Sequence, residues 1–198
     1  MAPSSLALSG HAAADELLAR DPLALLIGMV LDQQIPLERA FRSPFDLEQR
    51  LGASLDPGAI AAMDPDRLAA VFAQPPALHR FPGSMAKRVQ ELCRVVVQDY
   101  EGRAEDVWRT ASTGDELLAR IKRLPGFGEQ KARIFVALLG KQLAVSPPGW
   151  QEAARPFGTP GSYLSVADID SPEALGRVRE HKAAVKAEAK AKAAGRGG

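Results

Sequence analysis

Leu124-Pro125-Gly126-Phe127-Gly128 is a tight turn between two segments of helical periodicity. Gly126 and Gly128 supply backbone freedom where a Cβ would clash. Phe127, between them, is the apolar residue expected to insert into the core. Helical spacing also relates the apolar residues on both sides of the turn: Leu118, Ile121 and Leu124 before it, Ala132 and Val136 after it. The pattern predicts two closely packed helices joined by a hairpin.

The start of the second helix of this hairpin is a predicted anion site. Its first amides, from Gly128 to Gln130, have no intrahelical acceptor and carry the positive end of the helix dipole. A DNA phosphate fits such a site without sequence preference, and Lys131 adds a cation nearby. A plain helical hairpin is the alternative, but the complete pattern around the turn favours DNA binding.

The rest of the chain is typical of an all-α protein, because no alternation of apolar and polar residues is long enough for a strand. Asp21 followed by Pro22 is a helix start. Val95–Val97 is β-branched but lies inside a helical pattern. Helices are expected over Pro22–Gln34, in short pieces between Pro44 and Ala73, over about Gly83–Tyr100, from Thr113 to the turn, from the turn to Gly140, and from Ser171 onward.

We expect one domain over residues 1–198 with two lobes. Residues 1–30 and the C-terminal helix are expected to form one lobe, and the hairpin is expected in the other. Trp150 and Tyr163 lie in a Pro/Gly-rich loop and either stack on a base or anchor the loop to the core. The expected parts are a helical core at about 22–145, the hairpin at about 113–140, the loop at 146–165 and a basic helix at 171–198.

The charge is unevenly distributed along the chain. The net charge is +1, yet residues 1–74 carry −5 and residues 75–198 carry +6. A basic half facing nucleic acid fits this asymmetry, although a solvated surface would produce it too. The tail carries Lys182, Lys186 and Lys190, each four residues apart. They form either an arm that binds phosphates or a solvated helix, and we favour the solvated helix.

The composition argues against several cofactors. Cys93 is the one cysteine, so no intrachain disulfide and no iron–sulfur cluster can form within the chain, and a buried inert thiol is expected. The three histidines, His11, His79 and His181, have no metal-binding spacing. We therefore expect no cofactor and no metal site, with a monovalent cation at the hairpin left open.

No targeting or membrane-spanning segment is expected. The N-terminal residues lack a secretion signal, and the longest apolar run, Pro22–Leu31, is about half the roughly 20 residues that a bilayer span needs. The expectation is a cytoplasmic, nucleoid-associated monomer with no membrane partner.

These segments resemble the helix-hairpin-helix/Gly-Pro-Asp superfamily of DNA glycosylases, which includes endonuclease III, the adenine-mismatch glycosylase and the bacterial alkyladenine glycosylases. The resemblance covers roughly Pro22 to Val145. Val30–Ile35 is similar to the family's Leu-x-x-Gln helix end, where the glutamine matching Gln34 fills the gap left by a flipped base. Asp64–Leu68 followed by Pro82–Arg88 is similar to a short helix before a long helix that starts with a basic pair.

The resemblance implies a protein that binds double-stranded DNA, flips a nucleotide and cuts its N-glycosidic bond between two helical lobes. The residues it assigns to DNA binding are Gln33, Gln34, Leu124, Gly126, Phe127, Gly128, Gln130 and Lys131.

Two departures from the family pattern affect the mechanism. Gln130 occupies the position of the lysine that attacks C1′ in bifunctional members, and Lys131 is rotated about 100° from it on a helix. No lyase activity is therefore expected, and Lys131 is interpreted as a phosphate contact or a surface lysine. Ser146 stands where the family has its catalytic aspartate, and a serine cannot stabilise an oxocarbenium-like centre by charge.

Three hypotheses remain for the function. The leading one is a monofunctional base-excision DNA glycosylase that uses another carboxylate, with Asp32 as the best candidate and Asp168 or Asp170 as weaker ones. The second is a catalytically silent protein that recognises damaged DNA. The third is a protein-interaction domain whose hairpin is only structural.

Overall fold

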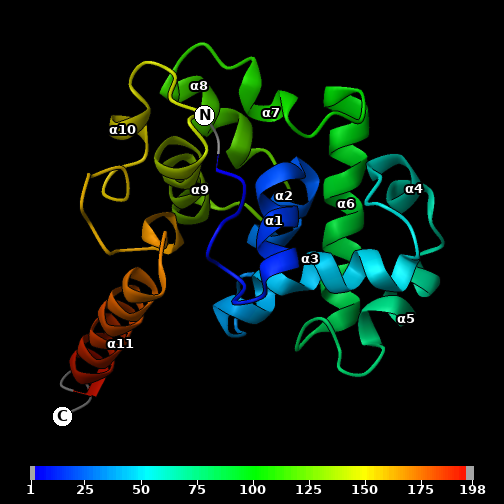
Figure 1. Ribbon diagram of the computed structural model, residues 1–198, viewed down its shortest axis with the longest axis horizontal. Coiled ribbons are helices and arrows are strands. Elements are labelled where there is room, and N and C mark those ends of the chain that lie inside the picture. Colours follow the sequence, from blue (N-terminus) through cyan, green and yellow to red (C-terminus); the bar gives the residue numbers. More distant parts are fainter. Residues whose placement is uncertain (1–2, 195–198) are drawn as a thin grey trace.

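The computed structural model describes residues 3–194, and these residues form helices and connecting segments without a strand, which confirms the all-α class (Figure 1). The elements are α1 (Ala12–Arg20), α2 (Pro22–Leu31), α3 (Leu37–Leu51), α4 (Pro57–Ala62), α5 (Pro65–Ala73), α6 (Pro82–Tyr100), α7 (Asp106–Arg109), α8 (Gly114–Lys122), α9 (Glu129–Gln142), α10 (Trp150–Ala153), the short 3-10 helix η1 (Val166–Asp168) and α11 (Pro172–Ala194).

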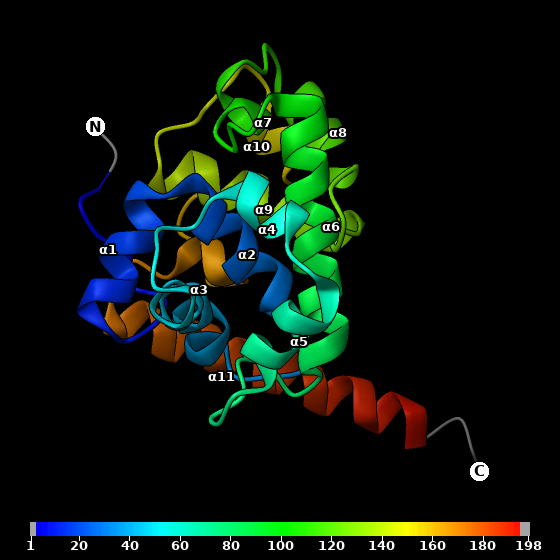
Figure 2. The same cartoon turned by 90° about the vertical axis from the view of Figure 1, so that its right-hand side faces the viewer.

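The helices pack in two groups. Helices α1 to α6 pack on one another through the pairs α2–α3, α4–α6 and α5–α6, whereas α8, α9, α10 and η1 form the second group, with α7 between the two (Figures 1 and 2). The expected two lobes are therefore present. Their membership differs from the prediction in one element: α11 packs against η1, which lies on α9, so it belongs with the hairpin rather than with residues 1–30.

Local signals place most helix starts correctly. The side chains of Asp21, Asp56, Asp64 and Thr113 each accept a backbone N–H of the helix that follows. Proline occupies the first turn after each of the three aspartates.

Two predicted helix bounds are wrong. Helix α2 ends at Leu31 instead of continuing to Gln34, because Pro36 disfavours helical backbone in the residue before it and the apolar run ends at Leu31. The stretch predicted as short pieces from Pro44 begins inside α3, which continues through Pro44 to Leu51. Pro44 has no N–H to donate within the helix. The hydroxyl of the preceding residue, Ser43, donates to the Arg39 carbonyl at this point.

The core is continuous between the two groups of helices. The predicted stripe on α6 is buried, and it comprises Met85, Val89, Leu92 and Val96. Cys93 lies beside it and is fully buried, as predicted, and burial raises the pKa of its thiol to about 12. Phe127 is also buried, and its ring meets Phe135 edge-on at 5.5 Å, so the hairpin turn is plugged into the core as predicted.

The Pro/Gly-rich loop is anchored by its aromatic residues. The Trp150 ring lies directly on Gly140 of α9, so close that a Cβ there would be 2.4 Å from Trp150 Cε3. The Arg177 guanidinium lies 4.7 Å from the centre of the Tyr163 ring. Of the two interpretations of these aromatics, anchoring is the one that their contacts support.

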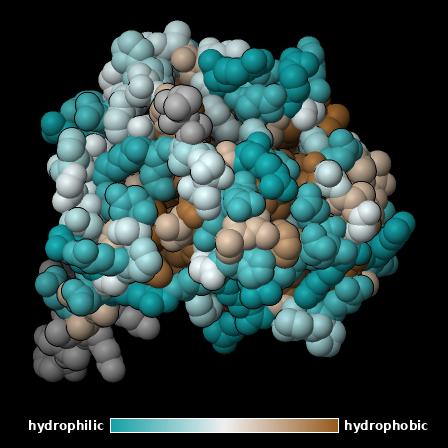
Figure 3. Space-filling view, in the orientation of Figure 1, coloured by the Kyte–Doolittle hydropathy of each residue, from teal (hydrophilic) through white to brown (hydrophobic). Residues whose placement is uncertain are grey.

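Hydrophilic residues cover most of the face seen in Figure 3, and hydrophobic side chains show mainly in hollows between the elements. No helix within residues 3–194 combines the length and apolar character needed to cross a bilayer.

We predict that Gly140→Ala destabilises the protein by about 1–3 kcal/mol, because the added methyl group must displace the Trp150 ring from a packed position. Urea unfolding at neutral pH measures the change. Gly83→Ala is the matched control: this glycine also lies in a helix, its added Cβ meets nothing within 4 Å, and it should be neutral or stabilising by up to about 1 kcal/mol. Equal stabilities of the two variants would contradict the packing argument.

Candidate nucleic-acid interface

The hairpin turn approaches the first lobe at Gly126. This glycine has a left-handed backbone, with φ +89°, and a Cβ on it would lie 3.1 Å from Arg88 Cδ and 3.3 Å from a Val30 methyl group. Both the left-handed backbone conformation and the lack of room for a Cβ favour glycine at this position. Gly128 differs, because it is exposed and a Cβ there would meet nothing within 4 Å. The turn is thus packed on one side and open on the other, where α9 begins.

The amides at the start of α9 are free to bind a ligand. The first hydrogen bond of the helix runs from the Ala132 N–H to the Gly128 carbonyl at 2.9 Å, and no side chain caps Gly128. Within residues 3–194, no acceptor contacts the N–H groups of Glu129, Gln130 or Lys131. These donors and the helix dipole together suit an anion such as a phosphate.

A carboxylate lies beside this anion site but is neutralised. Glu129 pairs with Lys122 from α8 and with Arg133, whose Nε lies 2.8 Å from the carboxylate. These two cations hold the pKa of Glu129 below its usual range. The negative charge next to the open amides is therefore balanced by the side chains around it.

The Lys131 side chain points toward α2, whereas the sequence predicted a phosphate contact or a surface lysine. Its ammonium donates to the Met29 carbonyl at 2.6 Å and to the Val30 carbonyl at 3.3 Å. These carbonyls lie in the last turn of α2, where helix carbonyls have no partner within the helix. Burial lowers the pKa of Lys131 to about 8. The contact ties the hairpin to the end of α2.

The loop after α2 carries Gln33 and Gln34, both predicted to bind DNA, and their side chains differ in exposure and contacts. The Gln33 side chain is held, because its amide donates to the Val30 carbonyl at 2.8 Å. Gln34 is exposed and has a left-handed backbone, with φ 57°, a strained conformation for a residue with a Cβ. Gln34 is thus the glutamine presented at the tip of the loop.

His79 fixes this loop from the other side. Its Nε2 lies 2.8 Å from the Gln33 carbonyl, and its Nδ1 accepts the Phe81 N–H at 3.0 Å, so Nε2 carries the proton and donates. The imidazole is buried, and burial lowers its pKa below 6.5. The ring therefore stays neutral at neutral pH and links the loop to the start of α6.

Phe81 is a residue that sequence reasoning missed. It is 42% exposed, the Arg80 guanidinium lies 5.3 Å from its ring centre, and it immediately precedes α6. The signal that was available is its position: an aromatic residue directly before Pro82, at a helix start that carries the basic pair Lys87–Arg88. The Phe81 backbone is linked to the Gln33–Gln34 loop through His79, and an exposed ring of this kind suits contact with a base.

Two adjoining hollows of about 620 and 430 Å³ lie between the end of α2, the start of α9 and helix α11; we call them the interlobe cleft. Four residues line both hollows: Asp32, Gln130, Ile134 and Lys182. Gln33, Gln34, Gly128 and Lys131 line the first hollow as well. The structure thus brings together five of the eight predicted DNA-binding residues and Asp32, while Gly126 packs against Val30 and Arg88 in the adjoining turn. Leu124 and Phe127 are instead buried in the core.

Asp32 is the notable carboxylate of the cleft. Among the side chains that the structure describes, none donates a hydrogen bond to its carboxylate or forms an ion pair with it within 4.0 Å. Burial raises its pKa, while the charges of Lys182 and Lys131 act to lower it. A partly desolvated, unpaired carboxylate beside an open cavity is typical of a functional site.

The other candidates for the missing carboxylate lie elsewhere. The Asp168 carboxylate pairs with Lys141 at 2.5 Å and accepts the N–H groups of Leu164 and Ser165, so it holds the loop together. Asp170 is exposed and does not line the cleft, and Ser146 is exposed. The side chains of Lys186 and Lys190, predicted on one face with Lys182, lie outside the described residues.

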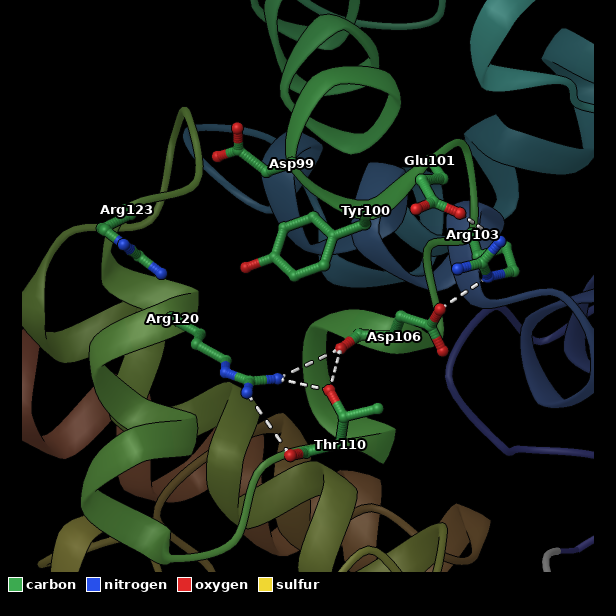
Figure 4. A pocket seen from close by; sticks show the side chains of 8 residues that line it. All are labelled: Asp99, Tyr100, Glu101, Arg103, Asp106, Thr110, Arg120 and Arg123. Carbon is green, nitrogen blue, oxygen red and sulfur yellow. Dashed lines mark hydrogen bonds and ion pairs between the residues drawn. The ribbon is translucent and has the colours of Figure 1, made fainter.

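A separate hollow of about 540 Å³ lies between the end of α6, α7 and α8 (Figure 4). The Tyr100 ring extends into it, with Arg120 and Arg123 on the α8 side. Most of its charged side chains are paired with one another. Asp106 forms ion pairs with Arg103 and Arg109, and Arg120 pairs with Glu116 and donates to the Thr110 hydroxyl. This hollow therefore does not compete with the interlobe cleft as a reactive site. Among the described residues, no group of three or more His, Cys, Asp or Glu side chains is placed to hold a metal ion.

Fold and site define an all-α protein whose helix-hairpin-helix presents open amides beside a cleft between two lobes. The family model described as "HhH-GPD superfamily base excision DNA repair protein" matches residues 27–196. The chain therefore belongs to this superfamily of base-excision DNA repair proteins, and DNA is its partner. Neither the curated proteins nor the solved structures contain a significant match.

We predict that His79→Phe removes a pH dependence of stability. Because the folded state holds the pKa of His79 below 6.5, the unfolded chain takes up a proton that the folded chain resists, and wild-type stability declines as pH falls below 6.5. Urea unfolding at pH 7 and pH 5 should show a smaller difference in the variant. The variant should also lose about 1–3 kcal/mol at pH 7 by leaving the Gln33 carbonyl and Phe81 N–H unpaired.

The control for this experiment is Ser43→Ala, which removes a hydroxyl that donates to the Leu78 carbonyl next to His79 and should retain the wild-type pH dependence. A pH difference in His79→Phe equal to that of the wild type would show that the imidazole does not carry the effect.

We predict that Glu129→Gln strengthens DNA binding, because it frees Lys122 and Arg133 for phosphates and removes a negative charge beside the open amides. Fluorescence anisotropy across a salt series should give a slope of log K against log salt that is steeper by about 1–2. Asp46→Asn, which breaks the exposed Arg42–Asp46 pair on α3, is the control and should leave the slope unchanged. Weaker binding by Glu129→Gln would place the phosphates elsewhere.

Proposed function

We propose that this protein is a monofunctional DNA glycosylase, a single domain that acts as a monomer on double-stranded DNA and hydrolyses the N-glycosidic bond of a damaged or mismatched base. The observation that carries the proposal is the unpaired carboxylate of Asp32 in the interlobe cleft, next to the hairpin that binds the backbone.

The open amides of Glu129 and Gln130 hold a phosphate of the strand that carries the lesion, and Lys87 on α6 contributes charge outside the cleft. Gln34 enters the space that the flipped nucleotide leaves, which its exposed position at the loop tip supports. Phe81 stacks on the bases next to that space. The His79 contacts keep Gln34 and Phe81 at a constant separation.

Asp32 supplies the negative charge that the missing family aspartate would otherwise supply. Its carboxylate stabilises the oxocarbenium-like sugar as the bond to the base breaks, and it accepts a proton from the attacking water. The raised pKa of Asp32 makes it a stronger base than an exposed aspartate. On the hairpin itself, Gln130 has no amine and the Lys131 ammonium donates to the carbonyls of α2, so neither residue is placed for Schiff-base chemistry.

The second candidate is a catalytically silent damage-recognition protein. The exposed Ser146 at the usual aspartate position favours it, since a hydroxyl there provides no charge. This candidate keeps the hairpin, Gln34 and Phe81 in the same roles but requires nothing of Asp32. The two candidates therefore differ in base release and agree in DNA binding.

We predict that the protein releases a base from at least one member of a panel of duplexes that each carry a single lesion, detected by alkali cleavage at the abasic product. On that substrate, Asp32→Asn should lower the single-turnover rate by about 10²–10⁴-fold and leave duplex affinity within about twofold. The rate of the wild type should fall as pH drops through the raised pKa of Asp32, at a higher pH than an exposed aspartate with a pKa of 3.8 would give.

Asp170→Asn is the matched control, because it removes an exposed carboxylate outside the cleft, and it should cleave as fast as the wild type. Full activity of Asp32→Asn would remove Asp32 from the mechanism. Lesion binding without release of any base would favour the silent protein.

A further inference from the structure

The charges around the cleft are mainly positive. Lys182 lines both hollows and, within residues 3–194, forms no ion pair. Lys131 lines the first hollow, and both lysines attract the Asp32 carboxylate. Glu129 also borders the first hollow, but its charge is balanced by Lys122 and Arg133. Apart from Asp32, the charges that face the cleft unbalanced are therefore cationic.

The walls of the second hollow are mostly apolar, which strengthens the electrostatic effect of Lys182. Its polar lining residues besides Asp32 and Lys182 are Gln130, Ser165 and His181. The remaining lining is apolar and comprises Ile134, Pro156, Phe157, Leu164, Val166 and Val185. Apolar walls lower the effective dielectric constant, so an ammonium at the edge of this hollow acts more strongly on a bound base than it would in water. A volume of about 430 Å³ leaves room for one extruded base.

Bases differ in the charge with which they leave. When the bond between C1′ and the base nitrogen breaks, the electron pair stays with the nitrogen. A neutral base, such as a deaminated or oxidised one, therefore departs as an anion. A purine alkylated on a ring nitrogen is cationic in the duplex and departs as a neutral molecule. Cations near the base stabilise the transition state in which a neutral base departs as an anion. The same cations repel a cationic N-alkylated purine when it binds.

We propose, resting on the glycosylase function above, that the interlobe cleft selects neutral lesion bases that leave as anions and rejects cationic N-alkylated purines. Lys182 is the residue that sets this choice. In the reaction, the C1′–N bond breaks with its electron pair on the base, and the oxygen of water bonds to C1′. The Asp32 carboxylate takes one proton of that water, and the leaving base is neutralised by a proton from Lys182 or solvent.

Two matched sets of duplexes test the proposal on the full-length protein. The first set is cleavable and compares uracil, hypoxanthine and 8-oxoguanine with 7-methylguanine and 3-methyladenine, with single-turnover base release as the readout. The second set carries 2′-fluoro sugars, which resist cleavage, and compares uracil with 7-methylguanine by equilibrium binding. We expect release only from neutral lesions, and tighter binding of the uracil analogue than of the 7-methylguanine analogue by roughly tenfold or more.

Charge reversal at Lys182 sharpens the test. Lys182→Glu should reduce or reverse the binding preference, and Lys182→Met should lower release from neutral lesions by roughly ten- to hundredfold. Lys87→Met is the matched control, because Lys87 is an exposed lysine on α6 that does not line the cleft. It should weaken binding to every duplex alike and leave the ratio between lesions unchanged.

The outcomes separate this proposal from the function on which it rests. Release of cationic bases with neutral bases left intact would overturn the selectivity while the glycosylase stands. Equal binding of the two uncleavable analogues, or a ratio that Lys182→Glu does not move, would overturn it as well. Absence of release from every lesion, with the uracil analogue still preferred in a Lys182-dependent way, would overturn the glycosylase activity and support the charge selection by the cleft.

Discussion

The contact between the Lys131 ammonium and the Met29 and Val30 carbonyls is the interaction on which the site depends. It joins the second helix of the hairpin to the last turn of α2, two elements separated by about a hundred residues of sequence. The ammonium provides a partner for the Met29 carbonyl and a second donor for the Val30 carbonyl, which also accepts the Gln33 side-chain amide. This contact, together with the packing of Gly126 on Val30, places the open amides of α9 and Asp32 at one cleft.

The loop after α2 is held from both lobes. Lys131 holds the helix end before it, the Gln33 side chain folds back on the same helix end, and His79 holds the Gln33 carbonyl from the start of α6. These contacts are what maintain Gln34 in its left-handed conformation at the tip. In the proposed function, a Gln34 side chain on a fixed loop would lose little conformational entropy on entering DNA, so the rigidity of this loop supports the proposal.

The position of Asp32 suggests how a member of this superfamily can lack the usual aspartate. Its carboxylate reaches the cleft from the end of α2, whereas Ser146 lies after α9 and lines neither hollow. A negative charge is unfavourable at a helix C-terminus, and burial adds to the cost. Lys131 and Lys182 offset part of it. The cations that make Asp32 tolerable are the same ones that give the cleft its charge.

The sequence by itself determined the features that depend on neighbouring residues: the all-α class, the helix starts at Asp21 and Thr113, the buried stripe on α6 and the hairpin with Phe127 in the core. Capping, periodicity and turn chemistry act within a few residues, so they are readable in one dimension. Only the tertiary structure decided the direction of Lys131, the packing of α11 beside the hairpin and the exposure of Phe81 before α6. Each of these results from contacts between distant segments, and no local pattern specifies which side chain meets which carbonyl once two lobes pack.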